Sequence, residues 1–489
     1  MHEAGVPPAV LQLLPGRGEV VGAALVADAR VRAVMFTGST EVATLINRTL
    51  AARGGDVPLI AETGGQNAMI VDSTALPEQV IGDVLASSFD SAGQRCSALR
   101  VLCLQDDIAD HVLEMLHGAT RELRLGNPAD VRIDVGPVID TEARAGLEAH
   151  IEAMRAAGCR VTQLPLPEAC AAGTFVPPTV IEIRSLDQLK REVFGPVLHV
   201  LRFGARDLLA LVDEINATGY GLTMGIHSRI DETIGDIIAR AHVGNLYVNR
   251  NMIGAVVGVQ PFGGEGRSGT GPKAGGPLYL HRLLRRSPGA EFATRAPVSE
   301  TFERFVAWLD QDGRALVEGD ATASLRTRAA HYREHGLSGL KLTLNGPTGE
   351  DNSLRFEPRG RVAGVAGSMA GYLHQALAAL ATGNELLLRD LPPTRELIAA
   401  LPAELRARIR IDTAWHSGGF SDVCGALLFD GSDGEADAWR MRLAQRDGPI
   451  LPLVRAQPEY DLGRLVVERT VSVNTAAAGG NASLMAMGS

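Results

Sequence analysis

The stretch that decides the fold covers residues 33–71 and reads AVMFTGSTEVATLINRTLAARGGDVPLIAETGGQNAMIV. Its first four residues form an apolar run, which a short turn at 37–39 closes. Apolar residues then recur at helical spacing as far as the two glycines at 54–55. Two further apolar runs, at 58–61 and 68–71, flank a second glycine turn. Strand, helix and strand in this order predict mainly parallel strands covered by helices.

The same alternation extends over most of the chain. Helices are predicted at 20–29, 77–91, from about 107 and at 141–157, with a strand at 100–105. Beyond an arginine-rich stretch at 285–335, strands are predicted at 362–365, 385–388 and 423–429, and helices at 369–381 and 394–408. The chain is therefore predicted to be an α/β protein, and its 489 residues suffice for about three domains.

Composition narrows the classes of function. There are 47 Lys and Arg against 57 Asp and Glu, a net charge of −10, which argues against a nucleic-acid-binding surface. Five cysteines without a CxxC pair favour free thiols in a reducing compartment, so a cytoplasmic protein is predicted. The uncharged stretch 362–384 contains four glycines and several polar residues, so a strand, a turn and a helix are predicted there instead of a transmembrane segment.

Four short motifs occur in a specific order. They are FTGST at 36–40, ETGGQN at 62–67, GQRCSA at 93–98 and EVFGPV at 192–197. Together they resemble the aldehyde dehydrogenase superfamily over about residues 1–280. The resemblance implies part of a Rossmann-type cofactor domain and an α/β catalytic domain, followed by a second aldehyde-dehydrogenase-like α/β domain.

A narrower resemblance covers nearly the whole chain. It rests on NRNMIGAVVGVQPFGG at 249–264, SGTGPKAGGP at 268–277, GPTGE at 346–350 and SVNTAAAGGNASLM at 472–485. These segments resemble the C-terminal part of the bifunctional proline utilization A enzymes. The resemblance implies NAD-dependent oxidation of L-glutamate γ-semialdehyde, formed from 1-pyrroline-5-carboxylate, to L-glutamate, which is the second step of proline catabolism.

The predicted chemistry needs a nucleophile and a base. A thiolate can attack an aldehyde and leave later, and Cys96 matches the family nucleophile. Hydride loss leaves a thioester that water must cleave, and Glu62 matches the family base. The backbone N–H of Cys96 is expected to stabilise the oxyanion. The alternative for Cys96 is an inert buried thiol, which is also the prediction for the other four cysteines.

The resemblance also implies cofactor contacts. Gly38 and Ser39 precede a helix whose N–H groups and dipole favour a phosphate of NAD, the alternative being a simple helix cap. Glu192 resembles the glutamate that accepts hydrogen bonds from the nicotinamide-side ribose. Phe194 would lie near the nicotinamide ring, unless it is an ordinary core residue.

Substrate contacts are expected in loops. The resemblance places the amino-acid end of the substrate at Ser97, Gly254 and Ala255, because backbone N–H groups in a glycine-rich concavity bind a carboxylate. The alternative is that the glycine only permits a tight turn. Phe262 would border the aliphatic part of the substrate.

The predicted domain organisation has five parts. These are the C-terminal part of a dinucleotide-binding domain (1–62), a catalytic domain (63–280), a helical linker or arm (281–335), a second Rossmann-like domain of structural role (336–455) and a C-terminal interaction tail (456–489). No metal site is predicted.

The resemblance also implies that family elements lie upstream of Met1: a side-chain amide for the oxyanion, a lysine for the adenosine ribose and a flavin-dependent proline dehydrogenase domain. A fragment of a larger, homo-oligomeric enzyme is therefore expected. Two alternatives stay open, namely a non-catalytic assembly module of that enzyme and a dehydrogenase for another acidic semialdehyde.

Overall fold

The N-terminal part forms a small unit of its own. The computed structural model describes residues 1–284, 292, 294–412 and 424–476. After α1 (Ala23–Ala27) come β1 (Val34–Thr37), α2 (Thr40–Arg53) and β2 (Leu59–Glu62), and the two strands pair in parallel. The Ser39 hydroxyl accepts a hydrogen bond of 3.3 Å from the Val42 N–H and caps α2. The order of strand, helix and strand predicted for this segment is confirmed.

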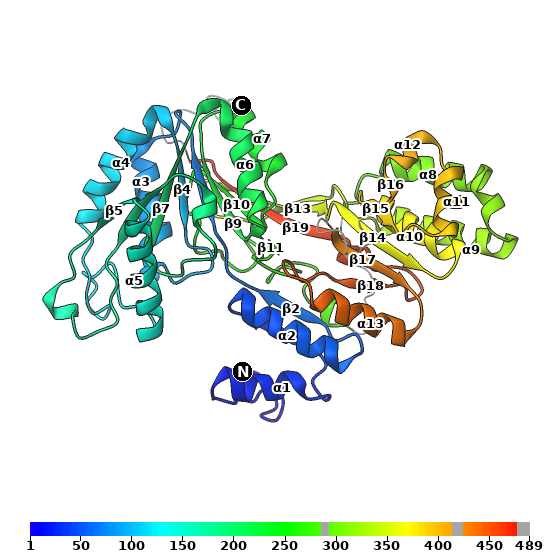
Figure 1. Ribbon diagram of the computed structural model, residues 1–489, viewed down its shortest axis with the longest axis horizontal. Helices are drawn as coiled ribbons and strands as arrows, with labels where there is room; N and C mark the ends of the chain where they lie inside the picture. Colours follow the sequence, from blue (N-terminus) through cyan, green and yellow to red (C-terminus); the bar gives the residue numbers. More distant parts are fainter. Residues whose placement is uncertain (285–291, 293, 413–423, 477–489) are drawn as a thin grey trace.

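A ten-stranded mixed sheet forms the largest layer, in the order β12-β13-β19-β10-β9-β3-β4-β7-β6-β5. Its seven strands from the first half of the chain are β3 (Ala68–Val71), β4 (Val101–Gln105), β5 (Arg160–Gln163), β6 (Thr179–Ile183), β7 (Val197–Phe203), β9 (Thr223–His227) and β10 (Asn245–Val248). The central strands are parallel and buried, as continuous apolar runs require when helices cover both faces. The surrounding helices are α3 (Pro77–Phe89), α4 (Asp106–Arg121), α5 (Thr141–Ala156), α6 (Leu208–Ala217) and α7 (Asp231–Arg240) (Figure 1). A two-stranded sheet of β8 (Tyr220–Gly221) and β11 (Glu265–Gly266) lies beside it.

A second sheet holds five parallel strands in the order β16-β15-β14-β17-β18. Its strands are β14 (Arg361–Ala366), β15 (Glu385–Leu388), β16 (Ile409–Ile411), β17 (Cys424–Asp430) and β18 (Leu453–Arg455). Counted along the chain this is the order 3-2-1-4-5, which dinucleotide-binding folds share. Its helices are α8 (Glu300–Gln311), α9 (Gly319–His335), α10 (Met369–Ala381), α11 (Pro392–Ala400), α12 (Ala403–Arg406) and α13 (Asp433–Ala444).

One predicted helix of this second sheet is wrong. The single helix expected at 394–408 is divided into α11 and α12, and the break falls at Leu401 and Pro402. Proline lacks an N–H and restricts the residue before it to extended backbone, so the first helix cannot continue. The uncharged stretch 362–384 contains β14 and α10, as expected. Among the described residues, no helix combines the length and apolar character needed to cross a membrane.

The end of the chain returns to the large sheet. Strand β19 (Val466–Asn474) lies between β10, to which it is parallel, and β13 (Glu350–Pro358), to which it is antiparallel; β12 (Lys341–Leu344) completes this edge. In Figure 1, β13 and β19 extend from the lobe of the large sheet toward the five-stranded sheet. The tail predicted at 456–489 thus contains a strand that pairs with β10 of the large sheet. Residues 477–489 of that predicted tail lie outside the described residues.

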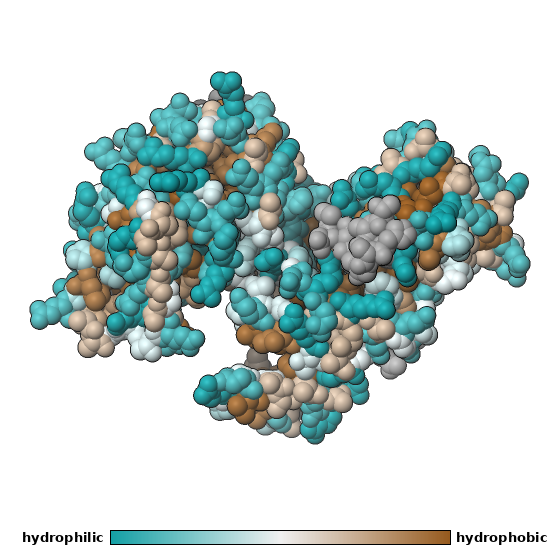
Figure 2. Space-filling model, in the orientation of Figure 1, coloured by the Kyte–Doolittle hydropathy of each residue, from teal (hydrophilic) through white to brown (hydrophobic). Residues whose placement is uncertain are grey.

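The segment predicted as a linker packs into a core. Phe305 of α8 and Leu325 of α9 are fully buried together with α10, so these helices belong to the hydrophobic core under the five-stranded sheet. The other domain limits stay predictions. Large apolar side chains such as Leu13, Met35 and Leu45 are exposed on the N-terminal unit, and Figure 2 shows a hollow between this unit and the lobe of the large sheet.

Candidate active site

Cys96 lies in a sharply bent loop after α3. Three consecutive residues before it, Ser91, Ala92 and Gly93, have φ angles of 55°, 53° and 65°. Left-handed backbone is costly for residues other than glycine, and such strain often marks functional loops. At Gly93 an added Cβ would lie 2.2 Å from the carbonyl oxygen of Gly195, so only glycine fits. The bend therefore brings the Cys96 loop against the 192–197 motif.

Two buried polar side chains hold this loop. The Asn67 amide donates hydrogen bonds to the carbonyls of Cys96 (2.7 Å) and Ala98 (2.8 Å). The Arg100 guanidinium donates to the carbonyls of Gly93 (2.7 Å) and Arg95 (2.9 Å). These side chains are 2% and 1% exposed, respectively. Buried polar groups of this kind fix loop geometry because every alternative position leaves them without a partner.

Arg100 also fixes the 192–197 motif. Its guanidinium lies 3.0 Å from the Glu192 carboxylate and 5.1 Å from the ring centroid of Phe194. Burial raises the pKa of Glu192, and the charge of Arg100 opposes this rise. An added Cβ at Gly64 would lie 1.7 Å from Glu192 Oε2, so the 62–67 motif passes directly over this carboxylate. Phe194 is 44% exposed, which excludes the core-packing alternative.

Glu62 is the last residue of β2, and its carboxylate is closely surrounded by backbone. One carboxylate oxygen, Oε2, accepts a 3.0 Å hydrogen bond from the Gly264 N–H, and the other, Oε1, is buried without a partner among the described residues. Burial raises the pKa of Glu62 to about 8. An added Cβ would lie 2.9 Å from this carboxylate at Gly263 and 3.1 Å from it at Gly269. The carboxyl group is thus tuned toward the range of a general base at neutral pH.

A buried lysine lies behind Glu62. The Lys273 ammonium donates to the carbonyl of Gly263 (2.7 Å) and to Oδ1 of Asn245 (2.6 Å). The Gly263 carbonyl and the Gly264 N–H belong to one peptide group. The Lys273 ammonium therefore binds one side of this peptide, and the Glu62 carboxylate binds the other. The Lys273 backbone N–H donates to Glu468 of β19, 2.8 Å away. Burial lowers the pKa of Lys273, while Glu468 and Glu62 oppose this.

The three motifs meet at the Cys96 thiol. Burial raises its pKa, and the negative charges of Glu192 and Glu62 raise it further. Hydrogen bonds from the backbone N–H groups of Ser97 and Cys96 act in the opposite direction. A carboxylate can affect the thiol in this way only from nearby. Cys96, Glu62 and Glu192 therefore share one neighbourhood.

The remaining predicted residues lie in separate places. Gly38 and Ser39 are exposed at the start of α2, and Ser97 is buried next to Cys96. Gly254, with φ of 78°, and Ala255 lie in the loop after β10. No described hydrogen bond joins either of them to Cys96 or Ser97.

Phe262 is half-buried and immediately precedes Gly263. Its backbone exchanges hydrogen bonds with that of Ala274, the residue after Lys273. Phe262 thus lies on the extended segment whose Gly264 N–H contacts Glu62, which is consistent with a residue that borders the site.

Sequence reasoning missed Asn67, Arg100 and Lys273 as functional residues. Asn67 and Arg100 each stand directly before an apolar run that becomes a buried strand, and Lys273 lies in a glycine-rich loop. A polar or charged residue at the start of such a run needs a buried partner, and that signal was available. The identity of the partners was not, because they lie far away in sequence.

Comparison with known proteins decides the family. The profile of the aldehyde dehydrogenase family matches residues 1–287. The chain belongs to this family. It is 52% identical over 506 aligned residues to the bifunctional protein PutA of Escherichia coli, with 99% of this chain and 38% of that protein covered. The resemblance to proline utilization A drawn from the motifs is confirmed, and the chain spans 38% of the length of this relative.

Two solved structures are similar as well. A 1-pyrroline-5-carboxylate dehydrogenase from Thermus, with bound NAD, is 38% identical with a TM-score of 0.53, over 58% of this chain and 55% of that one. Proline utilization A from Corynebacterium freiburgense has a TM-score of 0.73 at 23% identity, over 97% of this chain and 45% of that one. The second similarity shows that the fold is shared along nearly the whole chain.

Replacing Arg100 with methionine tests the buried contacts that join the Cys96 loop to Glu192. The variant leaves Glu192 and two loop carbonyls without their donor, and removing one partner of a buried ion pair costs about 3–5 kcal/mol. We expect a loss of that size in the free energy of unfolding, measured by urea titration. Arg202→Met is the control, because Arg202 pairs at the surface with Asp110, whose side chain is 90% exposed. Equal losses in both variants would contradict the role given to Arg100.

Proposed function

We propose that the chain carries out the NAD-dependent oxidation of L-glutamate γ-semialdehyde to L-glutamate. The observation that carries the proposal is the convergence of three motifs around Cys96. Asn67 of the 62–67 motif holds the Cys96 carbonyl, Arg100 joins the Cys96 loop to Glu192, and Gly64 lies against the Glu192 carboxylate. The similarity to PutA and to a 1-pyrroline-5-carboxylate dehydrogenase supports this substrate over other semialdehydes. We further propose that the unit works with a flavin-dependent proline dehydrogenase unit in a homo-oligomeric protein.

The residues for the cofactor fit NAD. The N-terminus of α2 is exposed at Gly38 and Ser39, where helix N–H groups favour a phosphate. The Glu192 carboxylate suits two neighbouring ribose hydroxyls, and the exposed ring of Phe194 offers an apolar face for the nicotinamide. When bound, NAD accepts the hydride that the substrate loses.

The chain's own residues supply the covalent chemistry. Cys96 Sγ bonds to the aldehyde carbon, and the backbone N–H of Cys96 stabilises the oxyanion that forms. Loss of hydride leaves a thioester on Cys96. Glu62 then takes a proton from water, the resulting hydroxide attacks the thioester carbon, and the carboxylic acid leaves as the thiolate is restored. Asn67 and Arg100 hold the nucleophile loop during both stages.

Substrate selection is proposed to come from the loops near Cys96. Ser97 and the backbone of Gly254 and Ala255 would bind the amino-acid end of the substrate, and Phe262 would border its methylene groups. The experiment is NADH formation by the full natural protein with L-glutamate γ-semialdehyde and with succinate semialdehyde. A higher kcat/KM for the first, by about 100-fold or more, is expected because a site built for polar groups rejects substrates that lack them.

The alternative, a non-catalytic assembly module, predicts different results for NAD binding and for NADH formation. A catalytic chain binds NAD, and a ligand that binds only the folded state raises the melting temperature. An assembly module would show neither this shift nor NADH formation above the background of a Cys96 variant. Either positive result therefore supports the enzyme, and both negative results would overturn it.

Lys273 is expected to set the working pH of Glu62. Replacing it with methionine removes the positive charge behind the Gly263–Gly264 peptide, so the pKa of Glu62 rises above its value of about 8. We expect the pH at half-maximal turnover to move upward by about one unit. Lys273→Arg keeps the charge and should shift the profile less. An unchanged profile in the methionine variant would show that Lys273 is only structural.

A further inference from the structure

A cavity of about 500 Å³ lies apart from Cys96. It is bounded by the C-terminal end of α2, by β18 and α13, by the segment that leads into β19 and by η7 (His281–Leu283). The N-terminal unit, the large sheet and the five-stranded sheet therefore all contribute to its wall. A volume of this size matches that of pockets for small organic ligands.

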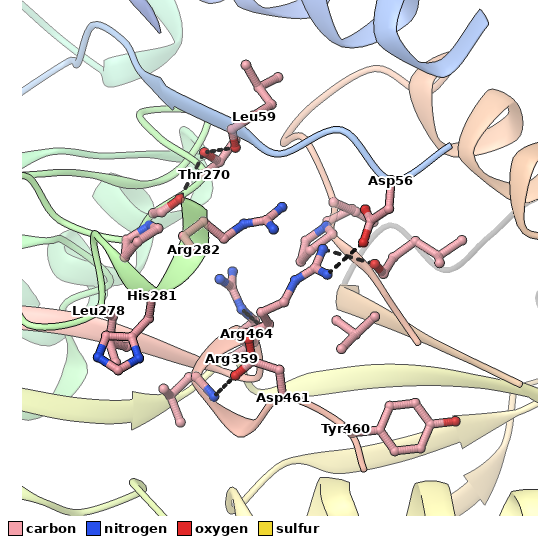
Figure 3. Close-up of a pocket in the computed structure, with 18 of the residues that line it drawn as sticks. Asp56, Leu59, Thr270, Leu278, His281, Arg282, Arg359, Tyr460, Asp461 and Arg464 are labelled. Atoms are coloured by element: carbon pink, nitrogen blue, oxygen red, sulfur yellow. Dashed lines mark hydrogen bonds and ion pairs between the residues drawn. The ribbon is translucent and has the colours of Figure 1, made fainter. Parts of the chain in front are cut away.

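Three arginines converge on this cavity. Figure 3 shows the guanidinium groups of Arg282, Arg359 and Arg464 extending into the same space from different segments. Burial, together with the charges of Arg464 and Arg359, lowers the pKa of Arg282 to about 9, although Asp56 and Asp461 act in the opposite direction. Like charges crowded into a partly buried space destabilise one another. We call Arg282, Arg359 and Arg464 the arginine cluster.

The nearby acids compensate only part of this charge. Asp56 lies 3.8 Å from Arg464 and also 3.8 Å from Arg440, so two arginines share one carboxylate. The Asp461 carboxylate accepts a hydrogen bond from the Gly463 N–H. The other acids on the wall, Glu265 and Glu468, contact Arg469 and Lys273. Glu459, which also lines the cavity, is half-buried.

Several donors of the arginine cluster have no acceptor. Within the residues that the structure describes, the Arg282 guanidinium forms neither a hydrogen bond nor an ion pair, and the buried Arg464 Nε lacks a partner. Arg359 uses Nε for the Arg464 carbonyl, which lies 2.7 Å away. Guanidinium donors without acceptors in a partly buried space where positive charges gather are what an anion site requires.

We propose that this cavity binds a phosphate ester of a small organic molecule through the arginine cluster. A carboxylate has two oxygens, which one guanidinium fork satisfies, whereas a phosphate group presents several oxygens and up to two charges to three forks. The opposite wall is apolar and includes Leu50, Leu443 and Ile450, which suits the organic part of the ligand. The bound ester joins the three units that form the cavity and stabilises their arrangement.

The test uses thermal unfolding of the full chain with inorganic phosphate and with glycerol 3-phosphate, each compared with sodium chloride at equal ionic strength. We expect both anions to raise the melting temperature, the ester at lower concentration. In Arg282→Met the concentration needed for the same shift should rise at least tenfold. The control is Arg240→Met, because Arg240 is an exposed residue of α7 paired with Asp213 and lies outside the cavity lining.

A second readout separates binding from a structural role. Without added anion, Arg282→Met should melt at the same temperature as the natural sequence or above it, since it removes one of three crowded charges. A lower melting temperature would show that Arg282 stabilises the fold by itself and would overturn the proposal. An equal response to phosphate in both proteins, or a shift no larger than that with chloride, would overturn it as well. None of these readouts depends on dehydrogenase activity.

Discussion

Cys96→Ala is expected to lower kcat for aldehyde oxidation by about 10⁴-fold or more, because Cys96 is the thiol that lies near both Glu62 and Glu192. Removing a covalent nucleophile typically costs losses of this order or larger. The residual rate should equal the background without protein. NADH formation by the full natural protein measures the effect, and NAD binding, followed as a thermal shift, should persist.

The control for this variant is Cys159→Ala. Cys159 is also half-buried, and its thiol accepts a hydrogen bond from Gln188 at 3.3 Å, in a segment that none of the four motifs contains. Its turnover should stay within about twofold of the natural protein, because a substitution away from the reacting atoms changes neither stage of the reaction and usually changes stability by less than about 0.5 kcal/mol. If Cys96→Ala kept more than a tenth of the natural turnover, the covalent mechanism would be wrong.

Glu62→Gln is expected to separate the two halves of the reaction. Capture of the aldehyde and hydride loss do not need the Glu62 base, whereas hydrolysis of the thioester does. Rapid mixing should show a burst of one NADH per Cys96, followed by turnover slowed by about 10²–10⁴-fold. Glu78→Gln, an exposed change on α3, should show no such separation. Loss of the burst itself would assign Glu62 to the first stage instead.

The pH dependence gives a second view of the same residue. The pKa of Glu62 is raised to about 8 by burial, and only the deprotonated carboxylate can take a proton from water. Hydrolysis should therefore be slow at pH 6, rise through about pH 8 and then level. In Glu62→Gln the slow phase should lose this rise. A rate that falls between pH 6 and pH 8 in the natural protein would contradict the assignment.

Much of the architecture could be predicted from local patterns. The strands at 68–71 and 385–388 and the helix at 369–381 were predicted with the bounds that the structure shows, because each is an apolar run closed by turn residues. The break at Pro402 was equally readable and was missed. The pairing of β10 with β19 could not be read, since more than 200 residues separate the two strands and no local pattern records a partner.

The candidate site divides in the same way. The order of four motifs was enough to predict that Cys96, Glu62 and Glu192 act together. The contacts that hold the site in place join segments far apart in sequence. Arg100 donates a hydrogen bond to Glu192, and Lys273 donates hydrogen bonds to Gly263 and to Glu468. Such contacts follow from the way the segments pack, so they become visible only in three dimensions.

Strand β19 has a consequence for biosynthesis. It is the third strand from one edge of the large sheet, and its Glu468 side chain accepts a hydrogen bond from the Lys273 backbone N–H, behind Glu62. During synthesis, Cys96 and Glu62 therefore leave the ribosome long before Glu468 has been translated. Local helices form early, whereas pairings between distant segments form last. Products that terminate before β19 should consequently lack both the strand that joins β10 to β13 and the contact between Glu468 and Lys273, so they should not reach the native arrangement behind Glu62.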